Sequence, residues 1–148
     1  MTVYTAIDRT APVVVDHSIL IGAPIEKVWA LHADINRWPA WQHDITAAEC
    51  TGPLAPGAEF TWTNFNFTVT STVYSLDSGS SILWGGESGG ITGVHEWIFE
   101  PTPAGTRVST SESFAGEPVD HAVDELQAQL DFSLRSWLTN LKTEAEKK

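Results

Sequence analysis

Two side chains of this sequence, His95 and Glu112, combine proton-transfer chemistry with a spacing that brings them together in an apolar interior. Residues 90–100 alternate as a strand does, so that His95 shares one face with large aromatic groups while carboxylates occupy the other face. Residues 106–114 alternate in the same way, and the face with the large apolar groups takes Glu112 with it. Because the two segments are consecutive strands that we expect to pair, the imidazole and the carboxyl group should meet inside the protein.

A buried His–Glu pair of this kind has two interpretations. Burial raises the pKa of a carboxylic acid, whereas a nearby carboxylate favours the imidazolium, so we expect the pair to titrate as a unit near neutral pH. Such a pair can act as acid and base in a cyclisation or a dehydration, which makes His95 and Glu112 the candidate catalytic residues. The alternative is a mutually satisfied bridge that only joins two strands, since structural ion pairs also shift pKa values.

Tryptophan is the commonest aromatic residue, with seven copies against six phenylalanines and two tyrosines. Trp buries a large flat surface but keeps one N–H that needs a partner, which suits the wall of a cavity better than a tight core. We therefore expect an internal cavity that holds a flat, apolar ligand. The predicted ligand-binding residues are inward-facing aromatic groups and two leucines of the last helix: Trp38, Trp41, Phe60, Trp62, Trp84, Trp97, Phe99, Leu126 and Leu130.

Four positions near the first helices each have two interpretations. Trp38 and Trp41 can form a flat lid over a ring-shaped ligand, or they can seal the end of the sheet. His32 can reach the rim of the cavity or hydrogen-bond a backbone carbonyl in the core. Asp34 is better explained as a helix cap than as an acid.

The frame that positions these side chains begins with a strand and two short helices. Residues 13–21 are rich in β-branched side chains and indicate a strand. Pro24 suits the first turn of a helix. Asp34 can cap a second short helix that runs through Trp38 and that Pro39 should end.

Strand signals dominate the chain from there to the last helix. Turns rich in Gly and Pro separate six strands, which predicts an antiparallel meander at residues 45–50, 58–64, 67–76, 80–86, 90–100 and 106–114. From Pro118 to the C-terminus, apolar residues recur three, four or seven positions apart, which predicts one long amphipathic helix with Trp137 as an anchor to the sheet. The predicted fold class is α+β, with a seven-stranded antiparallel sheet wrapped around the C-terminal helix.

This order of elements and its local sequence words resemble the polyketide cyclase/dehydrase group of the SRPBCC superfamily, whose START-like domains have the helix-grip fold. The matching segments are APIEKVWALHADINRWPAWQHDI (23–45), GPLAPGAEFTW (52–62), ILWGG (82–86), GITGVHEWIFEP (90–101), GTRVSTSESFAGEP (105–118) and SLRSWLTNLKTEAE (133–146). The resemblance covers about residues 13–147 and implies an apolar ligand pocket between the sheet and the long helix. It does not select a reaction, because the superfamily includes cyclases, dehydratases, lipid carriers and chaperone regulators.

Composition limits the partners of the protein. The chain indicates a single domain over residues 1–148, with residues 1–11 as a loose arm. A formal net charge of −11 argues against nucleic acid and membrane surfaces as partners. The single Cys50 excludes an intrachain disulfide and fits a cytoplasmic protein. The histidines lack metal-ligand spacing, so we expect neither a metal nor another cofactor. The oligomeric state stays open, with a homodimer as one alternative.

The leading hypothesis is a cofactor-free cyclase or dehydratase that acts on a small apolar, aromatic or polyketide-derived molecule in an internal cavity. The alternative is a non-enzymatic carrier or sensor of a small hydrophobic ligand, which needs the same cavity but no acid–base pair. A third hypothesis is a protein-interaction module whose surface matters and whose interior is filled.

Overall fold

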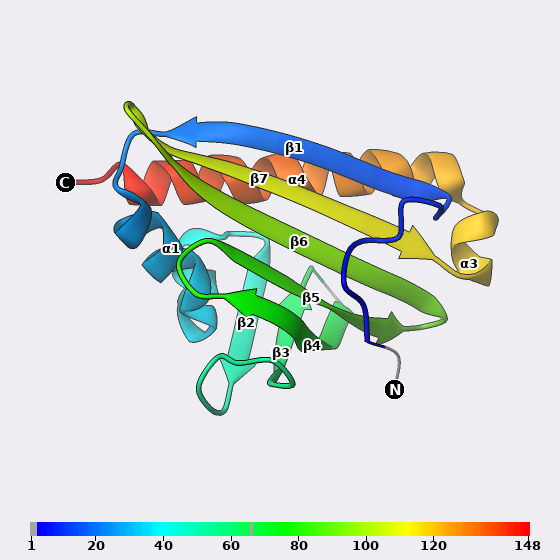
Figure 1. Cartoon of the computed structure of the whole chain (residues 1–148). Helices are drawn as coiled ribbons and strands as arrows, with labels where there is room; N and C mark the ends of the chain where they lie inside the picture. Colours follow the sequence, from blue (N-terminus) through cyan, green and yellow to red (C-terminus); the bar gives the residue numbers. More distant parts are fainter. Residues whose placement is uncertain (1–2, 66) are drawn as a thin grey trace.

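A single curved antiparallel sheet organises the molecule, as the computed structural model of residues 3–65 and 67–148 shows (Figure 1). The strands are β1 (Val13–Ile21), β2 (Ile45–Cys50), β3 (Glu59–Asn64), β4 (Phe67–Asp77), β5 (Ser81–Ser88), β6 (Ile91–Thr102) and β7 (Gly105–Ala115). Their order in the sheet is β1-β7-β6-β5-β4-β3-β2, so β1 and β2 are its edges. The predicted seven-stranded meander is confirmed.

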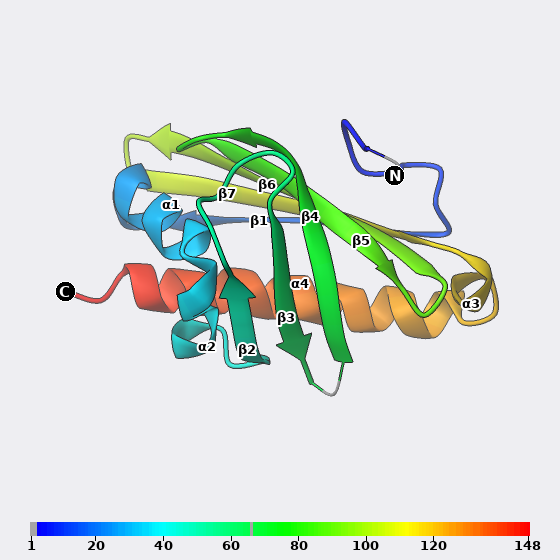
Figure 2. The ribbon, with the colours of Figure 1, turned by 90° about the horizontal axis from the view of Figure 1, so that it is seen from below.

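A long C-terminal helix, α4 (Val123–Ala145), crosses the concave face of the sheet (Figure 2). Its buried stripe includes Leu130, Leu134, Trp137 and Leu141, which recur every three or four residues as one helical face requires. The shorter helical segments are α1 (Ile25–Ala33), η1 (Ile35–Arg37), α2 (Trp38–Trp41) and α3 (Glu117–Asp120). Within the described residues, no helix is long and apolar enough to cross a membrane.

The last helical region is broken, in contrast to the single helix predicted from Pro118. Pro118 lies in the first turn of α3, and the helix is interrupted at His121 and Ala122 before α4 begins. The interruption lets α3 bury Val119 completely while α4 follows its own direction across the sheet. The 3.6-residue pattern continues through the break, which explains why the sequence did not reveal it.

Two details near the first helices also differ from the prediction. Pro39 does not end a helix but lies at the start of α2, where its missing N–H leaves no hydrogen bond unmade. Asp34 precedes η1 without a capping hydrogen bond from its side chain to any described residue. Its backbone carbonyl accepts a bond from the N–H of Arg37 instead, at 3.0 Å.

The N-terminal segment is not a loose arm along its whole length. Ile7 is buried on the convex face of the sheet, where it packs with Leu83 and Val94 in a small second core. The backbone N–H of Asp8 donates a hydrogen bond to the hydroxyl of Ser113, at 3.0 Å. Figure 1 shows the segment in front of the sheet, on the side opposite α4. The segment therefore covers a part of the convex face around β5 and β6.

Candidate functional site

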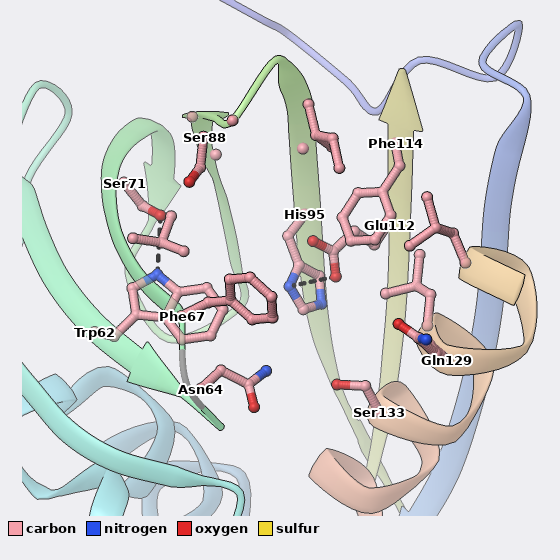
Figure 3. A pocket seen from close by; sticks show the side chains of 18 of the residues that line it. Trp62, Asn64, Phe67, Ser71, Ser88, His95, Glu112, Phe114, Gln129 and Ser133 are labelled. Carbon is pink, nitrogen blue, oxygen red and sulfur yellow. Dashed lines mark hydrogen bonds and ion pairs between the residues drawn. The ribbon is translucent and has the colours of Figure 1, made fainter. Parts of the chain in front are cut away.

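A cavity of about 420 Å³ lies between the N-terminal half of α4 and the strands β3 to β7. Its wall is mainly apolar, with large contributions from Trp62, Trp84, Phe114 and Trp137. Polar side chains enter it from several directions, and Figure 3 shows Asn64, Ser71, Ser88, Glu112, Gln129 and Ser133 around the space. A hollow of this size, with a few polar groups in an aromatic wall, fits a small organic ligand.

Glycines of β5 and β6 create part of this hollow. Gly86 and Gly93 alternate with Trp84 and His95 on the inner face, line the cavity and contribute no side chains to fill it. A Cβ atom at Gly85 would collide with the carbonyl oxygen of Gly93 on the neighbouring strand. The glycine-rich turn between the two strands, including Gly89, also lies at the cavity.

His95 and Glu112 meet at the wall of this cavity, as the strand alternation predicts. They are directly opposite each other in the pairing of β6 with β7. His95 Nδ1 lies 3.2 Å from Glu112 Oε1, and the two side chains are 2% and 12% exposed. Figure 3 shows the carboxyl group turned toward the hollow and the imidazole behind it.

The hydrogen bonds around the imidazole define where its proton lies. The Thr110 hydroxyl donates to the carbonyl oxygen of Glu96, at 3.0 Å, and its oxygen is 2.7 Å from His95 Nε2. The Thr110 hydroxyl has one hydrogen, which it donates to the Glu96 carbonyl oxygen. The hydrogen between Thr110 and His95 therefore belongs to Nε2, which donates it to the Thr110 oxygen. In a neutral ring Nδ1 then carries a lone pair, and its 3.2 Å contact with Glu112 is favourable when the carboxyl group holds a proton.

The environment supports this neutral form of the pair. Burial raises the pKa of Glu112 to about 8. Burial, with a smaller effect from His32, lowers the pKa of His95 well below its ordinary value of 6.5. Desolvation therefore outweighs the attraction between an imidazolium and a carboxylate, which was the opposing effect considered from the sequence. At neutral pH the site presents a neutral histidine and a carboxylic acid that still holds its proton.

Four of the nine predicted ligand-binding residues line the cavity: Trp62, Trp84, Leu126 and Leu130. The other five lie elsewhere in the packed core: Trp38, Trp41, Phe60, Trp97 and Phe99. Trp97 and Phe99 share the inward face of β6 with His95, but they lie further along the strand. There α1 covers them, and the ring of Trp29 contacts Phe99 edge to face. Alternation predicts which face a side chain occupies, but not whether that part of the face is filled.

The two tryptophans around Pro39 seal the end of the sheet. Trp38 is 1% exposed, and its ring contacts those of Trp84 and Trp137. Trp41 is 3% exposed and contacts Trp137 from the other side. Of the two predicted roles, the structure supports the seal, because neither ring is placed to cover the cavity.

His32 is buried in this aromatic core, where its ring centre is 4.4 Å from that of Trp97. Its backbone carbonyl accepts a hydrogen bond from the indole N–H of Trp38, at 2.8 Å. Neither ring nitrogen has a partner among the described residues, so the predicted bond to a backbone carbonyl is absent there. Burial lowers the pKa of His32 to about 3, which keeps the ring neutral.

The sequence interpretation missed several residues of the cavity wall. On α4, Gln129 and Ser133 line the space together with Leu126, Leu130 and Trp137. The signal was present, because residues three, four and seven positions apart share one helical face. Two polar side chains in an apolar stripe mark the part of that face that is not in contact with the sheet.

Phe65 and Phe67 also line the cavity, although both are exposed. Phe65 has a φ of 55°, which is rare for a side chain of this size. Among the described residues, no group of three or more His, Cys, Asp or Glu side chains is placed to hold a metal ion.

The fold of the protein is similar to that of several solved structures. A hypothetical protein of Helicobacter pylori superposes with a TM-score of 0.82 at 18% identity, over 99% of each chain. A START superfamily protein of Mycobacterium smegmatis superposes with a TM-score of 0.77 at 12% identity, over 90% of this chain and 97% of that chain. The di-domain ARO/CYC StfQ from the steffimycin biosynthetic pathway gives a TM-score of 0.73 at 15% identity, over 91% of this chain and 52% of that chain.

These likenesses establish the fold, whereas the sequence itself establishes the family. No curated protein matches the sequence. Residues 12–146 match the family described as polyketide cyclase / dehydrase and lipid transport, which is nearly the whole chain. The chain, with its helix-grip fold and its hollow beneath α4, belongs to the polyketide cyclase/dehydrase and lipid transport family.

Proposed function

We propose that the protein is a cofactor-free dehydratase or cyclase for a small, flat ketone-bearing molecule bound in the cavity beneath α4. The observation that carries this proposal is the neutral Glu112–His95 pair at the wall of that cavity. The similarity to an ARO/CYC protein of a biosynthetic pathway supports a polyketide-derived substrate.

The pair can move protons without placing a net charge in the apolar cavity. In a dehydration, the free oxygen of Glu112 takes a proton from the carbon next to the substrate carbonyl, while the proton on Oε1 passes to His95 Nδ1. The enolate that forms is balanced by the imidazolium. His95 then returns its proton to Oε1, and the other carboxyl oxygen delivers a proton to the leaving hydroxyl group. The substrate loses water and gains a double bond, and the pair returns to its starting state.

Thr110 gives the imidazole a fixed orientation for this exchange. It holds Nε2 at 2.7 Å, and its own hydroxyl is tied to Glu96 at 3.0 Å. His95 Nδ1 is therefore aimed at Glu112 before a substrate arrives. Pre-orientation lowers the barrier, because the reacting groups need no reorganisation during the proton transfers.

The aromatic wall provides the binding surface for the flat part of the substrate. The indole N–H of Trp62 donates a hydrogen bond to the buried Ser71 hydroxyl, at 3.0 Å, which holds that ring at the cavity. Trp84 packs against Trp62 edge to face and contacts the ring of His95. A planar ligand against these rings would lie beside the acid–base pair.

A β-hydroxy ketone tests the proposal. 4-Hydroxy-4-phenylbutan-2-one loses water to form a conjugated enone, which is followed by its ultraviolet absorbance. We expect the wild type to accelerate this reaction and E112Q and H95Q to lose about 100-fold or more of that rate, with ligand quenching of tryptophan fluorescence retained. E87Q is the matched control, because Glu87 is exposed and is not part of the cavity wall. Equal rates in the wild type and E112Q would contradict the catalytic role and leave a ligand carrier as the function.

A further inference from the structure

The cavity wall has an unusual charge composition. Glu112 and His95 are its only titratable side chains among the described residues, and none of the lysines or arginines lines it. His95 is held neutral by burial, so the single group that can carry a charge in the hollow is a carboxyl group. A site for a carboxylate or phosphate ligand normally supplies a cation or several N–H donors to it.

The surface near the cavity also has carboxylates. Glu125 is exposed one helical turn before Gln129, which lines the cavity, so the two share a face of α4. Asp124 is exposed beside it, and Glu117 and Asp120 are exposed on the adjoining α3. The negative charge of this end of the molecule raises the local concentration of cations and repels anions.

The cations of the protein gather at the opposite end. Lys27 and Arg37 flank a groove beside Glu144, near the C-terminus of α4. Lys142 bonds to the carbonyl of Leu20 at the end of β1, and three more lie close by: Arg107, Lys147 and Lys148. Arg9 and Arg135 are paired with aspartates at 2.9 and 2.7 Å, and Lys142 and Lys147 are paired with Glu146 and Glu144. None of the eight cationic side chains therefore contributes to the cavity wall.

We propose that the cavity selects its ligand by charge: it takes a molecule with a protonated amine, for which Glu112 is the counter-ion, and rejects carboxylate and phosphate isosteres. The proposal rests on the cavity being the ligand site and narrows the substrate class to amino ketones and related organic cations. With such a substrate Glu112 starts the reaction as a carboxylate, which itself takes the proton next to the carbonyl and delivers it to the leaving hydroxyl group. Trp62, Trp84, Trp137 and Phe114 surround the same space, and aromatic rings stabilise a cation beyond what a hydrocarbon wall does.

Binding of an amine must displace the proton of Glu112. At neutral pH the carboxyl group is mostly protonated, since burial raises its pKa to about 8. An ammonium ion beside it favours the carboxylate, so the proton leaves to solvent as the ligand enters. Because the pKa is close to neutral, this release costs little affinity, whereas an anionic ligand gains no cationic partner and loses its hydration.

Three ligands of one shape test the proposal: 2-(2-naphthyl)ethylamine, 2-(2-naphthyl)ethanol and 2-naphthylacetate. We expect the amine to bind about 100-fold more tightly than the acetate, with the alcohol between them. Calorimetry in buffers of different ionisation enthalpy should show release of nearly one proton per amine bound at neutral pH, and none for the alcohol. In E112Q both the proton release and the preference for the amine should disappear, whereas E87Q should keep them.

Each other outcome contradicts a defined part of the reasoning. If the alcohol binds and the amine is no tighter than the acetate, the charge selection is wrong while the ligand cavity of the proposed function stands. If the amine is preferred but E112Q keeps both the preference and the proton release, Glu112 is not the counter-ion. If none of the three ligands binds, the proposed function and this inference are both overturned.

Discussion

Replacement of Glu112 by Gln should stabilise the protein, although it removes the central group of the candidate site. An unfolded chain loses the Glu112 proton above its ordinary pKa of 4.5, whereas the folded protein holds it up to about 8. The folded state therefore binds more protons in this window, and wild-type stability falls as the pH rises through it. Glutamine has no proton to lose, and its neutral amide can take the place of the protonated acid beside His95 Nδ1.

The size of the stabilisation follows from the number of pH units between the pKa values of Glu112 in the unfolded and the folded state. Each pH unit between the two pKa values removes about 1.4 kcal/mol from the wild type. E112Q should therefore match the wild type near pH 4.5 and be more stable by about 3 kcal/mol at pH 7. For a chain of 148 residues this corresponds to a rise in melting temperature of roughly 6–12 °C.

Urea unfolding followed by tryptophan fluorescence measures this difference directly, at several pH values between about 4.5 and 8. E87Q controls for the loss of one negative charge, because Glu87 is exposed and lies outside the cavity wall. A constant difference between E112Q and the wild type across the range would refute the reasoning. So would a less stable E112Q at pH 8, since it would show that the carboxylate is well accommodated in the fold.

Three further substitutions test other parts of the structure by the same unfolding measurement. H32L should raise the free energy of unfolding by about 2 kcal/mol near pH 5 and by little at pH 8. The reason is that burial lowers the pKa of His32 to about 3, so the wild type loses stability as the pH falls below 6.5. An equal gain at both pH values would contradict this. G85A should lose about 1–3 kcal/mol or more, since its Cβ meets the backbone of Gly93, whereas an unchanged stability would show that β5 and β6 can separate there. Ile7→Ala should lose about 1–3 kcal/mol if the N-terminal segment is part of the folded core, and no loss would show that it is detached.

The meeting of His95 and Glu112 was predictable from local signals. The alternation of side chains along each strand places His95 and Glu112 on the inner face, and the turn signal around Ala104 sets the register of the two strands. Thr102 and Gly105 pair across a two-residue loop, which brings position 95 opposite position 112. The ionisation of the pair was not predictable, because it depends on how completely the surrounding elements exclude water.

The extent of the cavity was also beyond the sequence pattern. Trp62 and Trp97 are both inward-facing tryptophans of strands, yet only Trp62 lines the hollow. The difference arises from α1 and α2, which fill the space above one end of the sheet and leave the other end open. Such an arrangement depends on the packing of distant segments, and a window of neighbouring residues carries no information about it.

Gly93 gives this fold a position from which its ligand preference can diverge in evolution. The atoms nearest to a Cβ there belong to the side chains of Phe114 and Glu112, at 3.3 Å and beyond, so a small side chain would project into the hollow without displacing a strand. Gly86, directly opposite it on β5, lacks this freedom, because a Cβ there would lie 2.7 Å from the backbone oxygen of Thr70. In a duplicated copy of the gene, a single codon change at position 93 can thus alter the cavity wall next to Glu112 while the sheet stays intact. The tolerance of one glycine, set against the constraint on its neighbour, allows one scaffold to acquire different small-molecule partners.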